Sequence, residues 1–354
     1  MGLLEYATRT VPDVVKKAKA SFYNRDPFLA RLQSRQRVKR SGGTNVRVVR
    51  IKSGHSDVVE INATNLSVPL AKKETLSSMS GDWAKFIKPI ILPHIDRDRM
   101  SSQADVKMWL QDMTTAAMLG LKNQACRQIY LGTESALAGL GTLNGTVTGL
   151  SSSGFENGAL RFQTPVLQAA AGVTYLNETR VNDTTSFENN WFNQYADHGG
   201  LGTSFLKSAE EVKITADSYA EDEEGISLGV LAIADHVALG EEVRSYPGGS
   251  NASAITYTID DLNKGRAHPT IHVAGGIQYY SNRWMSAHTE IEPCYLLNPN
   301  GCEWWVNAGN DFRTTKFTDH LETSNQDADV GYIILEVQLA VPNLLVNGCM
   351  SNPA

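Results

Sequence analysis

The chain has 354 residues, of which 42% are hydrophobic, and its 32 basic and 38 acidic side chains give a net charge of −6. This acidic balance argues against a protein that coats nucleic acid over its whole surface, although local basic patches remain compatible with it. A chain of this length can bury a large core, and one large or two medium domains are expected.

Residues 3–18 have apolar side chains at helical spacing, with Pro12 near the middle of the stretch. This pattern predicts a short amphipathic helix, or two half-helices interrupted at the proline, which lacks a backbone N–H to donate. A frayed tail is the alternative interpretation.

The segment 31–52 contains many basic residues and no acidic one. Its basic residues are Arg31, Arg35, Arg37, Lys39, Arg40, Arg47, Arg50 and Lys52. Because like charges repel, the segment should resist collapse on its own. We expect it to dock on phosphate groups or on the carboxylates of another subunit. A solvated basic tail is the alternative.

Residues 45–93 read mainly as β structure, with strand-like runs at 45–51, 56–61 and 83–92. The residues between these runs are polar and rich in turn formers, and 77–82 (SSMSGD) is interpreted as a turn. The apolar content is thin, and an isolated two-stranded ribbon is only marginally stable in water. We therefore expect contacts with residues outside 45–93 to stabilise this β segment.

Residues 101–131 form the clearest predicted helix, with an apolar stripe that steps by three or four and Ser102 as a candidate N-cap. Such a helix spans roughly 45 Å, which suits the backbone of a flat, extended body. Further along the chain, 203–219 is predicted to be helical, 226–234 a buried strand, and 235–245 a helix capped by Asp235.

Residues 330–341 show the best strand pattern of the chain. One predicted face consists of Ile333, Leu335, Val337, Leu339 and Val341. The opposite face consists of Tyr332, Ile334, Glu336, Gln338 and Ala340. We therefore expect one long strand near the end of the sequence.

The sequence contains no phosphate-binding glycine loop, no nucleophile elbow and no zinc-protease motif. His268 and His272 stand four residues apart, but Pro269 argues against a helix there and no nearby carboxylate completes a metal site. Asp327 and Asp329 lack the further oxygen ligands that calcium would need. No catalytic, cofactor-binding or metal site is predicted, and the chain is expected not to be an enzyme.

The four cysteines are irregularly spaced and form no CxxC pair. They are Cys126, Cys294, Cys302 and Cys349. A disulfide framework or structural zinc site is therefore not expected. No stretch approaches the ~20 apolar residues of a membrane span, and we expect a soluble protein made inside a cell.

Several segments, in order, resemble the major capsid proteins of tailed bacteriophages, which have the Hong Kong 97-like fold. Residues 26–43 (DPFLARLQSRQRVKRSGG) resemble the N-terminal arm of that family, and Gly81-Asp82-Trp83 with the run after it resembles the return strand of its extended E-loop. Residues 101–131 resemble its spine helix, and 324–348 (SNQDADVGYIILEVQLAVPNLLVNG) its closing strand. Residues 187–193, with Trp191, resemble a landmark of the peripheral domain, whereas 245–320 match poorly.

The resemblance implies an α+β Hong Kong 97-like capsid fold with four parts. These are an N-terminal arm (1–44), an E-loop (45–95), a peripheral domain (96–224 and 316–354) and an axial domain (225–315). It also implies candidate intersubunit or DNA-facing contacts. These residues are Arg31, Arg35, Arg37, Lys39, Arg40, Arg47, Arg50 and Trp83.

The function that the resemblance implies is that of a coat protein. It would assemble with itself, as hexamers and pentamers, into the icosahedral shell around the double-stranded DNA of a tailed phage. Portal, scaffolding or decoration proteins and non-specifically bound DNA are the expected partners, with no membrane and no cofactor. The expected location is the virion, after assembly in the host cytoplasm. The alternatives are an encapsulin-like nanocompartment shell, a β-rich hydrolase, or a nucleic-acid-binding protein that acts through residues 31–52.

Overall fold

The structure is a computed structural model, which describes part of the chain residue by residue. The described residues are 3–24, 26–51, 76–99, 103–131, 140, 174–176, 178–179, 194–198, 204–220, 225–245, 255–256, 270–272, 276–285, 292–319 and 327–352. The predictions for Lys52, Ser102, Trp191, His268 and the run 56–61 lie outside them. Among the described helices, none is both long and apolar enough to cross a membrane.

A six-stranded sheet is organised around one long strand, β16 (Ala328–Ala340). This strand confirms the prediction of a long strand near the end of the sequence. Strand β4 (Ala84–Pro93) runs antiparallel to it, from Ala328 opposite Pro93 to Val337 opposite Ala84. The other members are β13 (Glu303–Asn307), β14 (Arg313–Thr314), β15 (Thr318–Asp319) and β1 (Val38–Ser41), which pairs parallel with β13.

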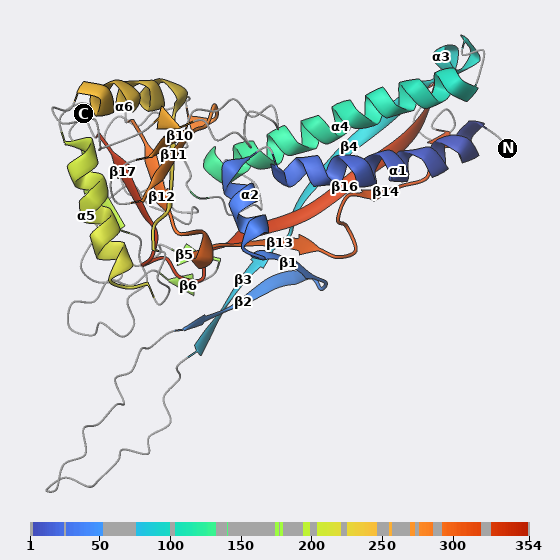
Figure 1. Cartoon of the computed structure of the whole chain (residues 1–354). Helices are drawn as coiled ribbons and strands as arrows, with labels where there is room; N and C mark the ends of the chain where they lie inside the picture. The colour runs from blue at the N-terminus through green and yellow to red at the C-terminus, as the bar shows by residue number, and fades with distance from the viewer. Residues whose placement is uncertain are drawn as a thin grey trace, which may run out of the picture.

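Two helices lie side by side along the β4–β16 pair (Figure 1). Helix α4 (Gln103–Leu131) confirms the predicted long helix, and Val106, Leu110 and Leu121 of its apolar stripe are buried, whereas Met113 of the same stripe is exposed. Because one face of the helix covers the sheet and α1 lies beside it, the sequence-derived stripe is also the packing face. The short helix α3 (His94–Arg99) connects β4 to this layer.

Helix α1 spans Leu3–Asn24 without interruption, so the predicted end near residue 18, the break at Pro12 and the frayed-tail alternative are all wrong. Val11, Val15 and Phe22 are buried, whereas Pro12 is exposed. Packing of the buried face against α4 offsets the backbone hydrogen bond that a proline inside a helix removes.

A second sheet of seven strands has the order β7-β17-β12-β8-β11-β10-β9. Its strands are β7 (Gln194–Asp197), β8 (Leu228–Leu231), β9 (Ile255–Thr256), β10 (Thr270–His272), β11 (Gln278–Ser281), β12 (Cys294–Leu297) and β17 (Gly348–Ser351). The buried strand predicted at 226–234 is β8: its Leu228 and Val230 join the main core and Leu231 joins a second core on the opposite face.

Helices α5 (Phe205–Asp217) and α6 (Ile233–Ser245) flank this second sheet (Figure 1). The helix predicted at 203–219 is confirmed with slightly narrower bounds. Helix α6 begins two residues before Asp235, so the prediction that Asp235 is its N-cap is wrong. The buried apolar run continues from β8 almost directly into the helix, which leaves Asp235 in the first turn.

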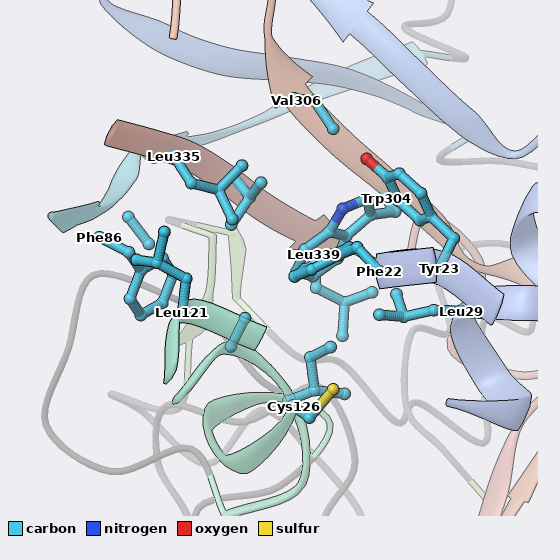
Figure 2. Close-up of a cluster of buried hydrophobic side chains, with 14 of the residues drawn as sticks. Phe22, Tyr23, Leu29, Phe86, Leu121, Cys126, Trp304, Val306, Leu335 and Leu339 are labelled. Carbon is cyan, nitrogen blue, oxygen red and sulfur yellow. The ribbon is translucent and has the colours of Figure 1, made fainter. Parts of the chain in front are cut away.

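The main core lies where α1, α2 (Pro27–Ser34), α4 and the six-stranded sheet meet. Figure 2 shows Trp304 of β13 close to Phe22 and Tyr23 of α1 and to Leu339 of β16. Trp304 is among the largest fully buried side chains of the described chain. A contiguous core of this kind joins segments from both ends of the sequence into one body.

Strands β2 (Asn45–Ile51) and β3 (Leu76–Asp82) form a two-stranded antiparallel ribbon that projects from the body (Figure 1). The prediction that 77–82 is a turn is therefore wrong. Met79 is buried opposite Val48, and this cross-strand pairing overrides the weak strand propensity of the serines. Strands β5 (Thr174–Tyr175) and β6 (Glu178–Thr179) and the 3-10 helix η4 (Pro299–Gly301) complete the described elements.

Candidate functional site

The basic segment begins on a helix that is fixed to the body. Asp26 caps α2, and its carboxylate accepts hydrogen bonds from the backbone N–H groups of Phe28 (3.0 Å) and Leu29 (3.1 Å) and from the Tyr130 hydroxyl (3.0 Å). Burial raises the pKa of Asp26, and these donors oppose that rise. Since Phe28, Leu29 and Leu32 are also buried, α2 is part of the core of its own chain.

Several of the predicted contact residues find partners within the chain. The Arg40 Nε lies 3.1 Å from Asp311 Oδ2, which also contacts the Lys19 ammonium, and Arg37 Nη1 lies 3.7 Å from Glu303 Oε1. The parallel pairing of β1 with β13 brings these basic residues beside those carboxylates. Arg37 and Arg40 thus have carboxylate partners within their own chain, and the expected docking of the segment on phosphate groups or on another subunit stays a prediction. Arg31 donates to the Gln278 side chain of β11.

The remaining predicted residues differ in exposure. Arg35 is the half-buried C-cap of α2, and Lys39 is half-buried in β1. On β2, Arg47 is exposed whereas Arg50 is buried. The predicted contact residues therefore lie on α2, β1 and β2. Some of them, such as Arg37, contact other residues of the chain, whereas Arg47 faces solvent.

The base of the ribbon is tied to the body by hydrogen bonds. The Trp83 indole N–H donates to the Gly43 carbonyl (3.0 Å), and the Gln338 side chain of β16 donates to the Asp82 carbonyl (2.7 Å). A Cβ added at Gly81 would lie 2.4 Å from the Leu176 side chain, so a larger residue does not fit there without movement. Trp83, a predicted contact residue, thus lies at the base of the ribbon.

The two faces of the ribbon differ in chemistry. Val46, Val48 and Met79 are buried on one face, whereas Arg47 and Val49 occupy the other, and Val49 is 63% exposed. This alternation follows from the period of two along a strand. We call Arg47, Val49 and their cross-strand neighbours Ser78 and Ser80 the outer ribbon face. An exposed apolar residue beside an arginine suits a contact with another protein surface.

Other large apolar side chains are exposed on the body. On β4, Ile87 is 50% and Ile91 43% exposed, and both follow the same alternation along the strand. Single exposed apolar residues are normal on soluble proteins. The outer ribbon face differs because it belongs to a two-stranded element that extends away from the body.

A buried carboxyl group in the first turn of α6 gives a pH-dependent prediction. Burial, and to a smaller extent the nearby Glu292, raises the pKa of Asp235 from 3.8 to about 6. The folded state therefore binds this proton more tightly than the unfolded state does. The contribution of Asp235 to stability is present below about pH 4 and is lost as the pH rises through about 6.

Asp235→Asn should therefore stabilise the subunit at about pH 7, by on the order of 1–3 kcal/mol, and have little effect at about pH 4. Melting curves of the two proteins across this pH range measure the difference. Glu241→Gln, which removes an exposed carboxylate of the same helix, is the control and should not change the pH profile. A stability difference for Asp235→Asn that is the same at every pH would contradict the assignment.

No family model matches the sequence, and no curated protein sequence matches it either. Among solved structures, the chain is similar to one in the capsid asymmetric unit of cyanophage A-1(L), with a TM-score of 0.55 and 13% identity over 92% of each chain. It is also similar to one in the capsid of a native GTA particle, with a TM-score of 0.50 and 12% identity over 92% of this chain and 91% of the other. The predicted α+β fold of the phage capsid proteins is confirmed by this likeness, which concerns the fold alone.

Proposed function

We propose that this chain is a major capsid protein, which assembles with itself through hexamers and pentamers into an icosahedral shell around the double-stranded DNA of a tailed phage. The observation that carries the proposal is the fold shared with a cyanophage capsid chain over 92% of both chains. Such a chain acts as a structural protein and not as an enzyme, in the virion after assembly in the host cytoplasm.

The four predicted parts remain our proposed division of the chain: arm 1–44, E-loop 45–95, peripheral domain 96–224 and 316–354, and axial domain 225–315. Several strand memberships cross these boundaries. Strands β7 and β17, for example, belong to the proposed peripheral range and lie in the seven-stranded sheet with β8 and β12. Strand β4 belongs to the proposed E-loop range and pairs along β16, and β13 belongs to the proposed axial range and lies in the six-stranded sheet. The described part of the E-loop that projects is therefore the β2–β3 ribbon.

The outer ribbon face is the contact surface that we propose for a neighbouring subunit. Its support is the exposure of Val49, the neighbouring charge of Arg47 and the fixation of the ribbon's base at Trp83 and Gln338. A ribbon held at its base and open on one face can gain stability by adding apolar contact with a second chain. The DNA-facing role of the arginines, and portal, scaffolding or decoration proteins as partners, belong to the same proposal.

Electron microscopy of the purified recombinant chain tests the function directly. We expect shells, capsomers or sheets, with or without an added scaffolding protein. Nuclease treatment and analysis of the contents separate a genome shell from a nanocompartment, because the latter would retain protein cargo instead of nucleic acid. A stable monomer at every concentration, with and without a scaffolding protein, would be incompatible with the proposal.

A further inference from the structure

A histidine and three aspartates meet at one end of the six-stranded sheet. His94 follows β4 as the first residue of α3, and its backbone N–H donates to the Asp327 carbonyl (3.1 Å). Asp319 of β15 is directly opposite Asp329 of β16 in the strand register. The sheet therefore brings His94 beside the aspartates of β15 and β16, which are more than 220 residues away in the sequence. We call His94, Asp319, Asp327 and Asp329 the His94 cluster.

The two nitrogens of the His94 ring face different carboxylates. Nδ1 lies 2.5 Å from Asp327 Oδ1, whereas Nε2 lies 3.4 Å from Asp329 Oδ1 and 3.9 Å from Asp319 Oδ1. A hydrogen bond donated by Nδ1–H to Asp327 leaves the Nε2 lone pair directed at the other two carboxylates. This carboxylate–histidine arrangement is the one that orients histidine ligands in metal sites.

The cluster is rich in negatively charged ligand groups. Three carboxylates contact a single imidazole ring, which carries at most one positive charge even when protonated. The Asp329 side chain is 0% exposed, so its carboxylate is removed from bulk water. Buried charges in proteins are either paired or bound to metal ions, because an isolated one costs a large desolvation energy. A divalent cation between the ligand atoms would add positive charge beside this buried carboxylate.

The spacing of the atoms fits such a cation. One ligand atom from each of His94, Asp319 and Asp329 lies within 4.8 Å of the other two. Zinc bonds of roughly 2.0–2.2 Å in tetrahedral geometry separate neighbouring ligand atoms by about 3.3–3.6 Å. The pair of His94 and Asp329 already has this separation. The Asp319 side chain is 53% exposed and can close the remaining gap by rotation.

We propose that His94 Nε2 and one carboxylate oxygen each from Asp319 and Asp329 bind a divalent transition-metal ion of the zinc class, with Asp327 orienting the imidazole and water completing the coordination. Imidazole favours zinc and related metals, whereas calcium and magnesium favour all-oxygen sites. The bound ion would link the junction of β4 and α3 to β15 and β16. This site is independent of the proposed shell function, since its binding is measured on the dissociated subunit.

Calorimetric titration of the metal-stripped full chain with ZnCl₂ tests the site. We expect one equivalent of zinc to bind, and His94→Ala to abolish this binding. Asp319→Asn, at an exposed position that should not affect folding, should weaken binding at least ~10-fold. The matched control Asp96→Asn removes a carboxylate of α3 that lies outside the cluster and should bind like the wild type. Zinc should also raise the melting temperature of the wild type and not that of His94→Ala.

Cobalt(II) as a spectroscopic probe distinguishes this site from the four buried cysteines. Nitrogen and oxygen ligation gives ligand-field absorption without thiolate charge transfer, which we expect. A thiolate band, or equal zinc affinity in the wild type and His94→Ala, overturns the proposal. Absence of zinc binding together with a melting temperature that rises on acidification in the wild type, but not in His94→Ala, also overturns it and identifies an imidazolium–carboxylate cluster instead.

Discussion

Trp304→Ala should destabilise the subunit by about 3–5 kcal/mol. Trp304 is fully buried on β13, between Val38 of β1 and Leu339 of β16 in the strand register. Figure 2 shows that its ring also lies against α1, near Phe22 and Tyr23. Removal of the indole leaves a cavity where β1, β13, β16 and α1 meet, and a typical domain has only about 5–15 kcal/mol of total stability.

Trp305→Ala is the matched control, because Trp305 is the next residue on β13 and is only half-buried on the other face. Its indole N–H donates to the Glu303 side chain (3.0 Å). We expect a loss of about 1 kcal/mol there. Chemical denaturation of dissociated subunits measures both values. Equal losses for the two variants would show that the core does not depend on Trp304 as described.

Elements with many repeats of one period could be predicted from the sequence. The stripe of α4 and the alternation of β16 extend over many residues, so each residue adds to the same signal. The continuation of α1 past Pro12 and the strand character of β3 could not be predicted, since both depend on a partner element. Helix α1 is supported by α4, and β3 is supported by β2.

The candidate site could be predicted only in part from the sequence, because its residues also depend on partners from distant elements. The charge of residues 31–52 is evident in the sequence, but the carboxylates of Glu303 and Asp311 are about 270 residues away and meet it only through the β1–β13 pairing. In the His94 cluster, Asp327 and Asp329 form a local pair that lacks the spacing of a metal motif. The histidine reaches them because β4 runs antiparallel to β16, which no local pattern encodes.

The double variant Arg47→Glu/Val49→Asp should prevent assembly and leave the subunit folded. Both side chains lie on the outer ribbon face, away from the buried Val46 and Val48, so the core keeps its contacts. Burial of one valine contributes about 2 kcal/mol, which corresponds to a ~30-fold change in the subunit concentration needed for assembly. Burying a new aspartate without a partner adds a further penalty.

Light scattering across a concentration series measures the assembly threshold, and far-ultraviolet circular dichroism with a melting curve reports the fold of the subunit. The control Arg47→Lys/Val49→Thr keeps the charge and the approximate shape and should assemble within ~10-fold of the wild-type threshold. Because nuclease-treated protein is used, a DNA-facing role of Arg47 cannot produce the defect. Unchanged assembly of the charge-reversed variant would exclude the outer ribbon face as an intersubunit contact and would leave Arg47 as a candidate for contact with packaged DNA, which salt-dependent DNA binding of the two variants can measure.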